Sequence, residues 1–307
     1  MNIMKRMKQA IALVMLVTSL LVPTSLKAQE NRLKIVTSFY PMYALTKQVV
    51  GDIHQVQMIN SGNGIHGFEP SVADVAAIAE ADIFIYHSSI LESWAKKLKQ
   101  TLKEKDVRMV EASEGLDMDK VAGLEEVEAI GGMSESSMYD PHTWLDPLEV
   151  ANEIQLIADQ LSEIDPDHAS DYQANAQEFT QEAQALVEEY QPKFEALSNK
   201  TFVTQHTAFS YLAKRFGLNQ LGISGVSSDI EPGSKQLLKV NQFVEDNGVQ
   251  TIFVEPNVSP KAAELVANTT GAKIETLSPL ESDPQNTKTF IENLRETIET
   301  LYQGLQS

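Results

Sequence analysis

Three histidines occur in segments whose composition suits a ligand-binding loop. His66 lies in the glycine-rich run GNGIHGF, where glycine lets the backbone wrap closely around a bound group. His142 lies in the proline-flanked run DPHTWLDP, and His206 follows the β-rich residues 201–204. Imidazole is the commonest protein ligand of metal ions, so these three side chains together predict a metal site.

A carboxylate from the C-terminal half would complete a tetrahedral set of ligands. Glu281 is well placed in the turn after residues 273–276, and Asp283 and Glu255 are competing candidates. Three neutral imidazoles and one carboxylate would leave a divalent ion with one net positive charge. A nitrogen-rich set of this kind suits Zn²⁺ better than Ca²⁺ or Mg²⁺, which prefer oxygen ligands.

The other histidines occur in plainer surroundings. His87 ends a β-rich run near the same predicted edge, so it is a candidate for supporting a ligand from behind. His54 and His168 lie near the starts of predicted elements, and both are expected to be solvated. Trp144 is close to a proposed ligand, but we expect it to pack rather than to bind.

The predicted elements bring these loops to one place. In both halves of the chain β-rich runs alternate with helical patterns, which is typical of βαβ units and a parallel sheet. Ligands of open α/β sheets bind beyond the carboxyl ends of the strands, where the histidine loops are expected. The predicted strands are 33–37, 55–59, 82–86, 107–110, 201–204, 218–221, 251–254 and 273–276. The predicted helices are 41–50, 70–79, 91–102, 208–216, 234–246, 260–270 and one that begins at about 287.

A long polar helix is predicted between the two α/β halves. Asp165 and Pro166 form a helix-start signal, and the residues that follow, up to about 197, are rich in Ala, Glu and Gln. The acidic segment from about 112 to 139 is expected to be a loop. The expected organisation is a signal peptide at 1–28, an N-terminal lobe at 29–163, a connecting helix at 164–198 and a C-terminal lobe at 199–307.

Composition excludes several classes of protein. The sequence has 307 residues with 24 Lys and Arg against 43 Asp and Glu, which gives a net charge of −19. This acidity argues against a nucleic-acid partner, because such binding depends on a basic surface. The sequence contains no cysteine, so disulfides, thiolate metal sites and a lipid anchor on an N-terminal cysteine are not expected.

The first residues are typical of a secretory signal peptide. Basic residues at 5, 6 and 8 precede an apolar run from about 10 to 22, and Ala28 offers a small residue for cleavage. Removal of residues 1–28 takes away four basic and no acidic residues, which changes the net charge from −19 to −23. We expect an exported protein, periplasmic or secreted, that is not lipid-anchored through cysteine.

Five short segments of the mature chain, which include the histidine loops, carry a resemblance to a known family. The chain resembles the cluster A-I solute-binding proteins of zinc and manganese ABC importers, and within them the streptococcal zinc-binding proteins also described as laminin-binding. The resemblance covers essentially the whole mature chain. It is most specific at residues 36–42 (VTSFYPM), 64–66 (GIH), 139–144 (YDPHTW), 202–212 (FVTQHTAFSYL) and 276–281 (TLSPLE).

The resemblance implies two (β/α)4-like lobes with parallel sheets, joined by one long rigid helix, with the metal in the cleft between the lobes. It implies His66, His142, His206 and Glu281 as the ligands. Manganese-type members have Glu in place of His206 and Asp near Glu281, so this ligand set favours zinc. Two departures are the absent lipid-bearing cysteine and the acidic loop, which lacks the histidines that some zinc importers carry there.

The main functional hypothesis is a zinc-binding component of an ABC transporter, which captures Zn²⁺ and delivers it to a cognate permease. Four protein ligands close the coordination sphere, whereas a zinc hydrolase, the disfavoured alternative, keeps one position open for water. A manganese importer component is the nearest alternative. An adhesin that binds host matrix such as laminin is suggested only by the family resemblance. We expect a monomer.

Overall fold

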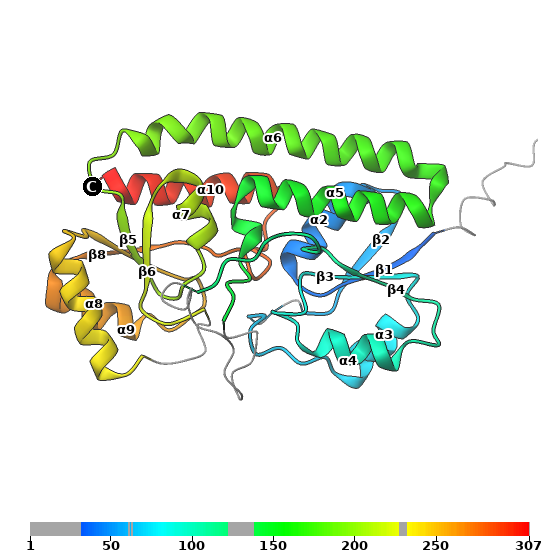
Figure 1. Cartoon of the computed structure of the whole chain (residues 1–307), viewed down its shortest axis with the longest axis horizontal. Helices are drawn as coiled ribbons and strands as arrows, with labels where there is room; N and C mark the ends of the chain where they lie inside the picture. Colours follow the sequence, from blue (N-terminus) through cyan, green and yellow to red (C-terminus); the bar gives the residue numbers. More distant parts are fainter. Residues whose placement is uncertain (1–31, 61, 63, 122–137, 227–231, 307) are drawn as a thin grey trace, which may run out of the picture. The chain divides into compact units, whose positions relative to one another are not determined.

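Two parallel sheets lie at the centres of two lobes in the computed structural model (Figure 1). The structure describes residues 32–60, 62, 64–121, 138–226 and 232–306. The predicted signal peptide at 1–28 and most of the predicted acidic loop, residues 122–137, lie outside these ranges.

Both sheets have the same connectivity. The strand order is β2-β1-β3-β4 in the first lobe and β6-β5-β7-β8 in the second, and all neighbouring strands are parallel. In each lobe the second strand in the sequence lies on one side of the first, and the third and fourth lie on its other side. The connections therefore leave the carboxyl ends of the two central strands in opposite directions, and a crevice forms between them. The strands are β1 (Lys34–Thr37), β2 (Gln55–Met58), β3 (Ile83–Tyr86), β4 (Arg108–Glu111), β5 (Thr201–Thr204), β6 (Asn219–Gly222), β7 (Thr251–Val254) and β8 (Lys273–Thr276).

The central strands are buried because helices cover both faces of each sheet. Every residue of β3, β5 and β7 is buried, which explains the continuous apolar sequence of β3 and the mainly apolar and threonine residues of β5 and β7. One face of the first sheet packs on α3 (Val72–Ala79) and α4 (Trp94–Thr101), with Phe84 in the shared core. In the second lobe, α8 (Ser234–Asp246) and α9 (Lys261–Thr270) contribute to the corresponding core.

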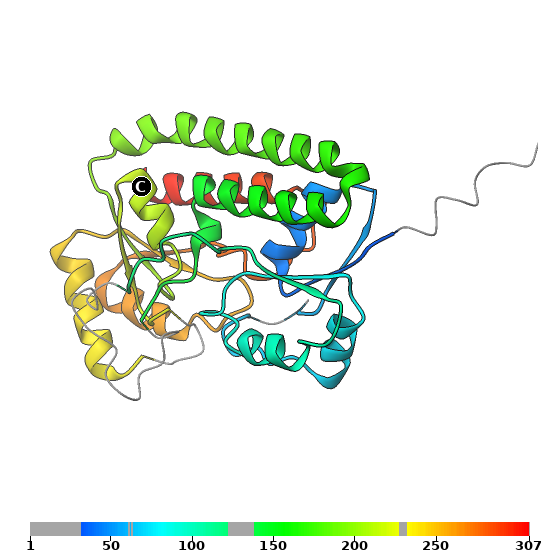
Figure 2. The same ribbon diagram turned by 45° about the vertical axis from the view of Figure 1, so that its right-hand side comes forward.

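A helical layer covers the opposite face of both sheets and unites the lobes. Its outermost member is α6 (Ala169–Glu195), which runs along the layer in Figures 1 and 2. With 27 residues, α6 is about 40 Å long. It packs against α2 and α5 of the first lobe and α10 of the second. The rest of the layer consists of α2 (Tyr40–Val50), α5 (Pro147–Ile164), α7 (Ser210–Phe216) and α10 (Phe290–Gln306).

The predicted fold class is confirmed, because two four-stranded parallel sheets are joined by one long helix. The main element that the sequence analysis missed is α5. Its start is nevertheless encoded locally, since the Asp146 side chain accepts a hydrogen bond from the Leu148 backbone N–H and Pro147 occupies the first turn. Predicted helix starts at 91 and about 287 fall three residues early.

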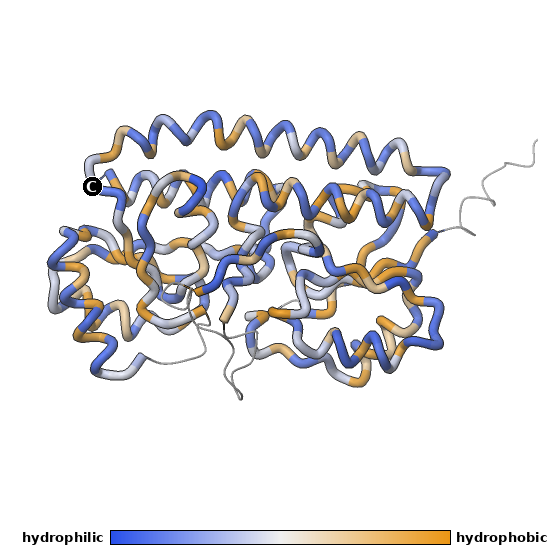
Figure 3. Tube along the Cα trace, in the orientation of Figure 1, coloured by the Kyte–Doolittle hydropathy of each residue, from blue (hydrophilic) through white to orange (hydrophobic). Residues whose placement is uncertain are grey.

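Hydropathy follows this layered arrangement. Figure 3 shows hydrophobic residues concentrated along the strands and recurring at intervals along α6, whose other residues are mostly hydrophilic. The buried residues of α6 include Tyr172, Phe179, Leu186 and Phe194. No helix among the described residues combines the length and the apolar character needed to cross a membrane.

Gly222, at the end of β6, provides a test of how tightly the second lobe packs around the His206 loop. A Cβ atom at this position would lie 2.2 Å from Thr207 Oγ1 and 2.7 Å from the Thr207 backbone nitrogen. We expect Gly222→Ala to lower the free energy of unfolding by about 1–3 kcal/mol, because backbone must move to accept the methyl group. Gly225→Ala is the matched control, since nothing lies within 4 Å of the added Cβ. Denaturant unfolding that gave equal midpoints for the two variants would contradict this packing.

Candidate metal centre

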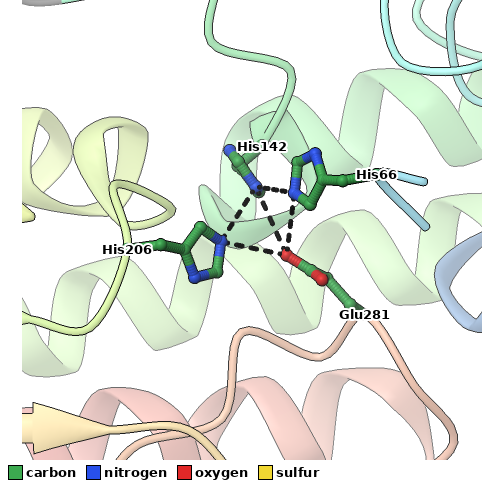
Figure 4. Close-up of side chains that lie close together, drawn as sticks. All are labelled: His66, His142, His206 and Glu281. Carbon is green, nitrogen blue, oxygen red and sulfur yellow. Dashed lines mark hydrogen bonds and ion pairs between the residues drawn. The ribbon is translucent and has the colours of Figure 1, made fainter. Parts of the chain in front are cut away.

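Loops at the carboxyl ends of four strands bring three histidines and one glutamate together. His66 follows β2 and His142 follows β4 in the first lobe, while His206 follows β5 and Glu281 follows β8 in the second. Figure 4 shows the four side chains pointing toward a common centre. His142 and His206 are fully buried, and the Glu281 and His66 side chains are only 6% and 9% exposed.

The four ligand atoms have the spacing of a tetrahedral metal site. His142 Nε2 lies 3.1 Å from His66 Nε2 and 3.4 Å from His206 Nε2. Glu281 Oε1 lies 3.1 Å from His206 Nε2, 3.3 Å from His66 Nε2 and 3.4 Å from His142 Nε2. A tetrahedral zinc ion with bonds of about 2.0–2.1 Å requires ligand atoms about 3.3 Å apart. These four residues are thus arranged to hold one such ion.

The turn that carries His142 is fixed by an anchor between the lobes. The residues after it form a short 3₁₀ helix, Thr143–Leu145, whose three side chains are all buried. Within it Trp144 is completely buried and donates from Nε1 to the carbonyl oxygen of Pro279, at 2.9 Å. Because Pro279 is two residues before Glu281, this bond ties a ligand turn of one lobe to a ligand turn of the other. Trp144 is therefore a packing residue, as predicted.

Two further carboxylates orient the buried histidines. Asp140 Oδ1 lies 2.6 Å from His142 Nδ1 and also accepts a hydrogen bond from the His142 backbone N–H. Glu255, directly after β7, makes a short hydrogen bond with His206 Nδ1. Each contact fixes the tautomer that leaves Nε2 free to bind a metal, and it makes the imidazole a stronger ligand. Glu255 thus supports a ligand from behind, and Asp140 is a residue that the sequence analysis missed. Its signal was its place two residues before His142 in the same proline turn.

The charges of this cluster shift the pKa values of its members. Burial lowers the pKa of His206, but hydrogen bonds and charges of Glu255 and Glu281 outweigh it and raise the pKa to about 10. Burial likewise opposes protonation of His142, whereas the charge and hydrogen bond of Asp140 raise its pKa above the usual value. Burial also acts against ionisation of Glu281, yet hydrogen bonds from the histidines hold its pKa well below the usual value. In the metal-free protein, a proton on His206 therefore offsets part of the negative charge of the carboxylates.

His87 and Asp283, the remaining candidates, do not join the four ligand atoms. His87 is completely buried behind the His142 turn, where its Nε2 lies 2.8 Å from Thr143 Oγ1. Asp283 accepts a hydrogen bond from the Gln285 backbone N–H and lines a cavity of about 790 Å³ that also borders Glu281. Among the described residues, this cavity lies directly next to the four-ligand cluster.

The structure corrects the prediction that His54 is solvated. His54 is only 2% exposed, and it lies with Asp165 and His168 in a second cluster of titratable side chains, at the corner between α5 and α6. The sequence could not reveal this, because 111 residues separate His54 from Asp165. His168 is partly exposed, with 40% of its side chain accessible.

The architecture and the buried ligand set are those of a metal-binding protein of the solute-binding class, and comparison with known proteins supports this assignment. The family model described as zinc-uptake complex component A, periplasmic, matches residues 35–304. The chain belongs to this family.

Relatives of known sequence and structure share the fold over most of the chain. Zinc-binding lipoprotein AdcA of Streptococcus pneumoniae serotype 4 is 36% identical over 285 residues, which cover 90% of this chain but 56% of AdcA. The chain thus spans little more than half the length of such relatives. The laminin-binding protein Lmb of Streptococcus agalactiae is 52% identical with a TM-score of 0.83, covering 90% of this chain and 100% of Lmb. A zinc-bound mutant variant of AdcAII from Streptococcus pneumoniae is 54% identical with a TM-score of 0.84, and the match covers 89% of this chain and 98% of AdcAII.

Asp140 offers a test of the orienting carboxylates. We expect Asp140→Asn to weaken zinc binding by about 10–100-fold, because the His142 ring loses its charged partner while its own ligand atom is retained. Asp159→Asn, which changes an exposed aspartate on α5, is the matched control and should bind as the wild type does. Equal zinc affinity in the two variants, measured by competition with a chelating dye, would show that Asp140 has no orienting role.

The raised histidine pKa values predict proton release when metal binds. At pH 7 the metal-free site carries a proton on His206, whose pKa is about 10, and the metal must displace it. The apparent zinc affinity should rise by about tenfold per pH unit for each proton displaced, from pH 6 to above pH 8. Calorimetry in buffers of different ionisation enthalpy counts these protons. A binding enthalpy that did not depend on the buffer would contradict the assignment.

Proposed function

We propose that this protein captures Zn²⁺ outside the cytoplasm and delivers it to the membrane permease of an ABC importer. The observation that carries the proposal is the closed tetrahedron of three imidazoles and one carboxylate. All four positions around the ion would be filled by protein, so no position would remain for the water that a zinc hydrolase activates. The function of AdcA as a zinc-binding lipoprotein and of the family in zinc uptake supports the same conclusion.

The ligands we propose are His66, His142, His206 and Glu281. Their donor atoms favour zinc over manganese, because imidazole suits Zn²⁺ whereas Mn²⁺ prefers oxygen ligands. The two fully buried histidines are held in the ligand orientation by Asp140 and Glu255. The proposed partner is the cognate permease, and the proposed working form is a monomer located in the periplasm or secreted.

Replacement of individual ligands tests the proposed site. Loss of a partner that supports a ligand typically lowers metal affinity by about 10–100-fold. We expect a larger loss of zinc affinity from replacement of a ligand itself, in His66→Ala, His142→Ala, His206→Ala and Glu281→Ala. His87→Gln is the matched control, because His87 is as fully buried as His142 and His206 but lies outside the ligand cluster. A loss of tight binding in His87→Gln with retention in His206→Ala would overturn the ligand assignment.

Metal choice is tested by His206→Glu, which replaces one nitrogen ligand with oxygen. In this variant zinc affinity should be lower than in the wild type, and the ratio of manganese affinity to zinc affinity should be higher. Competitive titration of both ions into the wild type and the variant measures the change. Equal zinc affinity in the two proteins would remove His206 from the site, and tighter binding of manganese than of zinc by the wild type would favour a manganese importer component.

Adhesion to laminin is a second candidate function, supported by similarity to Lmb, which is described as a bifunctional protein with adhesin and metal transporting activity. Binding of the purified protein to immobilised laminin, compared with binding to albumin, tests this candidate. It is independent of the zinc proposal, because either activity can be present without the other.

A further inference from the structure

A second group of metal-binding side chains lies at the corner where α5 ends and α6 begins, at the right of Figure 1. Asp165 follows the last residue of α5, and His168 ends the short 3₁₀ helix that leads into α6. His54 comes from the loop between α2 and β2, far away in the sequence. Each of these three residues offers one possible ligand atom, and the three atoms all lie within 4.8 Å of one another.

Three donors converge on one oxygen atom of Asp165. His54 Nε2 lies 2.9 Å from Oδ2, His168 Nδ1 lies 2.8 Å from it, and the Tyr172 hydroxyl donates to it at 2.6 Å. Burial favours the neutral acid, but the hydrogen bonds from these donors prevail and lower the pKa of Asp165. The carboxylate is therefore ionised at neutral pH, with two imidazole nitrogens directed at it.

We propose that His54, Asp165 and His168 form a second, weaker site for an imidazole-preferring divalent ion such as Zn²⁺. Two imidazoles and one carboxylate suit Zn²⁺, Cu²⁺ or Ni²⁺ rather than Mg²⁺ or Ca²⁺. Water would take the fourth position, as at zinc sites with three protein ligands. Each imidazole would then bind the ion through the lone pair of the nitrogen that lies near Asp165 and carry its proton on the other ring nitrogen.

Ion binding requires the three side chains to adjust. Tetrahedral ligand atoms lie about 3.3 Å apart, so the nitrogen–oxygen separations of 2.9 and 2.8 Å must lengthen by about 0.4–0.5 Å. The two imidazole nitrogens, which lie within 4.8 Å of each other, must take up a similar spacing. The His168 side chain is 40% exposed and the Asp165 side chain 14% exposed, so the ion can enter from solvent and His168 can move. His54 is buried and supplies a fixed ligand on the inner side.

The local charges favour a cation at this corner. Asp167 and Asp171 lie in the first turns on either side of His168 and add to the charge of Asp165. The negative end of α5 and the positive end of α6 meet here, so the two helix dipoles largely offset each other. With three protein ligands and partial exposure, this site should bind zinc more weakly than the closed four-ligand site.

Zinc stoichiometry tests the proposal. The purified protein, equilibrated with increasing zinc, should bind two ions, one tightly and one weakly. His168→Gln and Asp165→Asn should each reduce the total to one and keep the tight ion, whose retention also shows that the variant is folded. Tyr172→Phe removes a donor to Asp165 but no proposed ligand, and it should still bind two.

Two results would overturn the second site. One is a single zinc equivalent in the wild type at a large excess of metal. The other is a weak equivalent that persists in His168→Gln, as expected for nonspecific binding to surface carboxylates. Imidazole ¹⁵N chemical shifts supply an independent readout: the second equivalent should shift His54 Nε2 and His168 Nδ1 and leave the four-ligand site unchanged. His206→Ala should lose the tight ion and keep the weak one, which separates this proposal from the proposed function.

Discussion

The arrangement of the metal centre follows from the balance of charge in a buried site. Asp140, Glu255 and Glu281 lie with three imidazoles in a region from which water is almost excluded. Within the described part of the chain, the ion pairs of these three carboxylates are all with histidines. Buried negative charge is costly unless it is paired, so the cluster requires added positive charge. Without metal, a proton on His206 supplies part of it and the raised pKa of His142 favours a second, whereas one divalent ion can take the place of such protons. Metal and protons therefore compete for the same site.

The fold places this cluster where neither lobe could form it alone. Each sheet has its crevice at the carboxyl ends of its strands, and the two crevices face a shared centre to which each lobe contributes two ligands. The bond from Trp144 to the Pro279 carbonyl links the ligand turns directly. On the opposite side, α6 packs on helices of both lobes. Such a frame resists wide separation of the lobes, so exchange of the ion is expected to involve the loops around the cavity next to Glu281.

The sequence predicted the parts of this structure that depend on local pattern. Alternating β-rich and helical runs gave the two parallel sheets, and glycine or proline around His66 and His142 identified loops that the structure brings together. Its place in the turn after residues 273–276 favoured Glu281 and the family resemblance agreed, but excluding Glu255 and Asp283 required three-dimensional proximity. Contacts distant in sequence stayed hidden for the same reason. His54 was expected in solvent because nothing near it in the chain indicates that Asp165 and Tyr172 enclose it.

X-ray absorption at the zinc edge, on protein loaded with one equivalent of Zn²⁺, tests the central claim most directly. We expect four nitrogen or oxygen ligands at about 2.0–2.1 Å, with the multiple-scattering signal of three imidazoles. In His66→Ala that signal should correspond to two imidazoles. A six-coordinate ion surrounded mainly by oxygen, or an imidazole signal that does not change in His66→Ala, would contradict the four-ligand site.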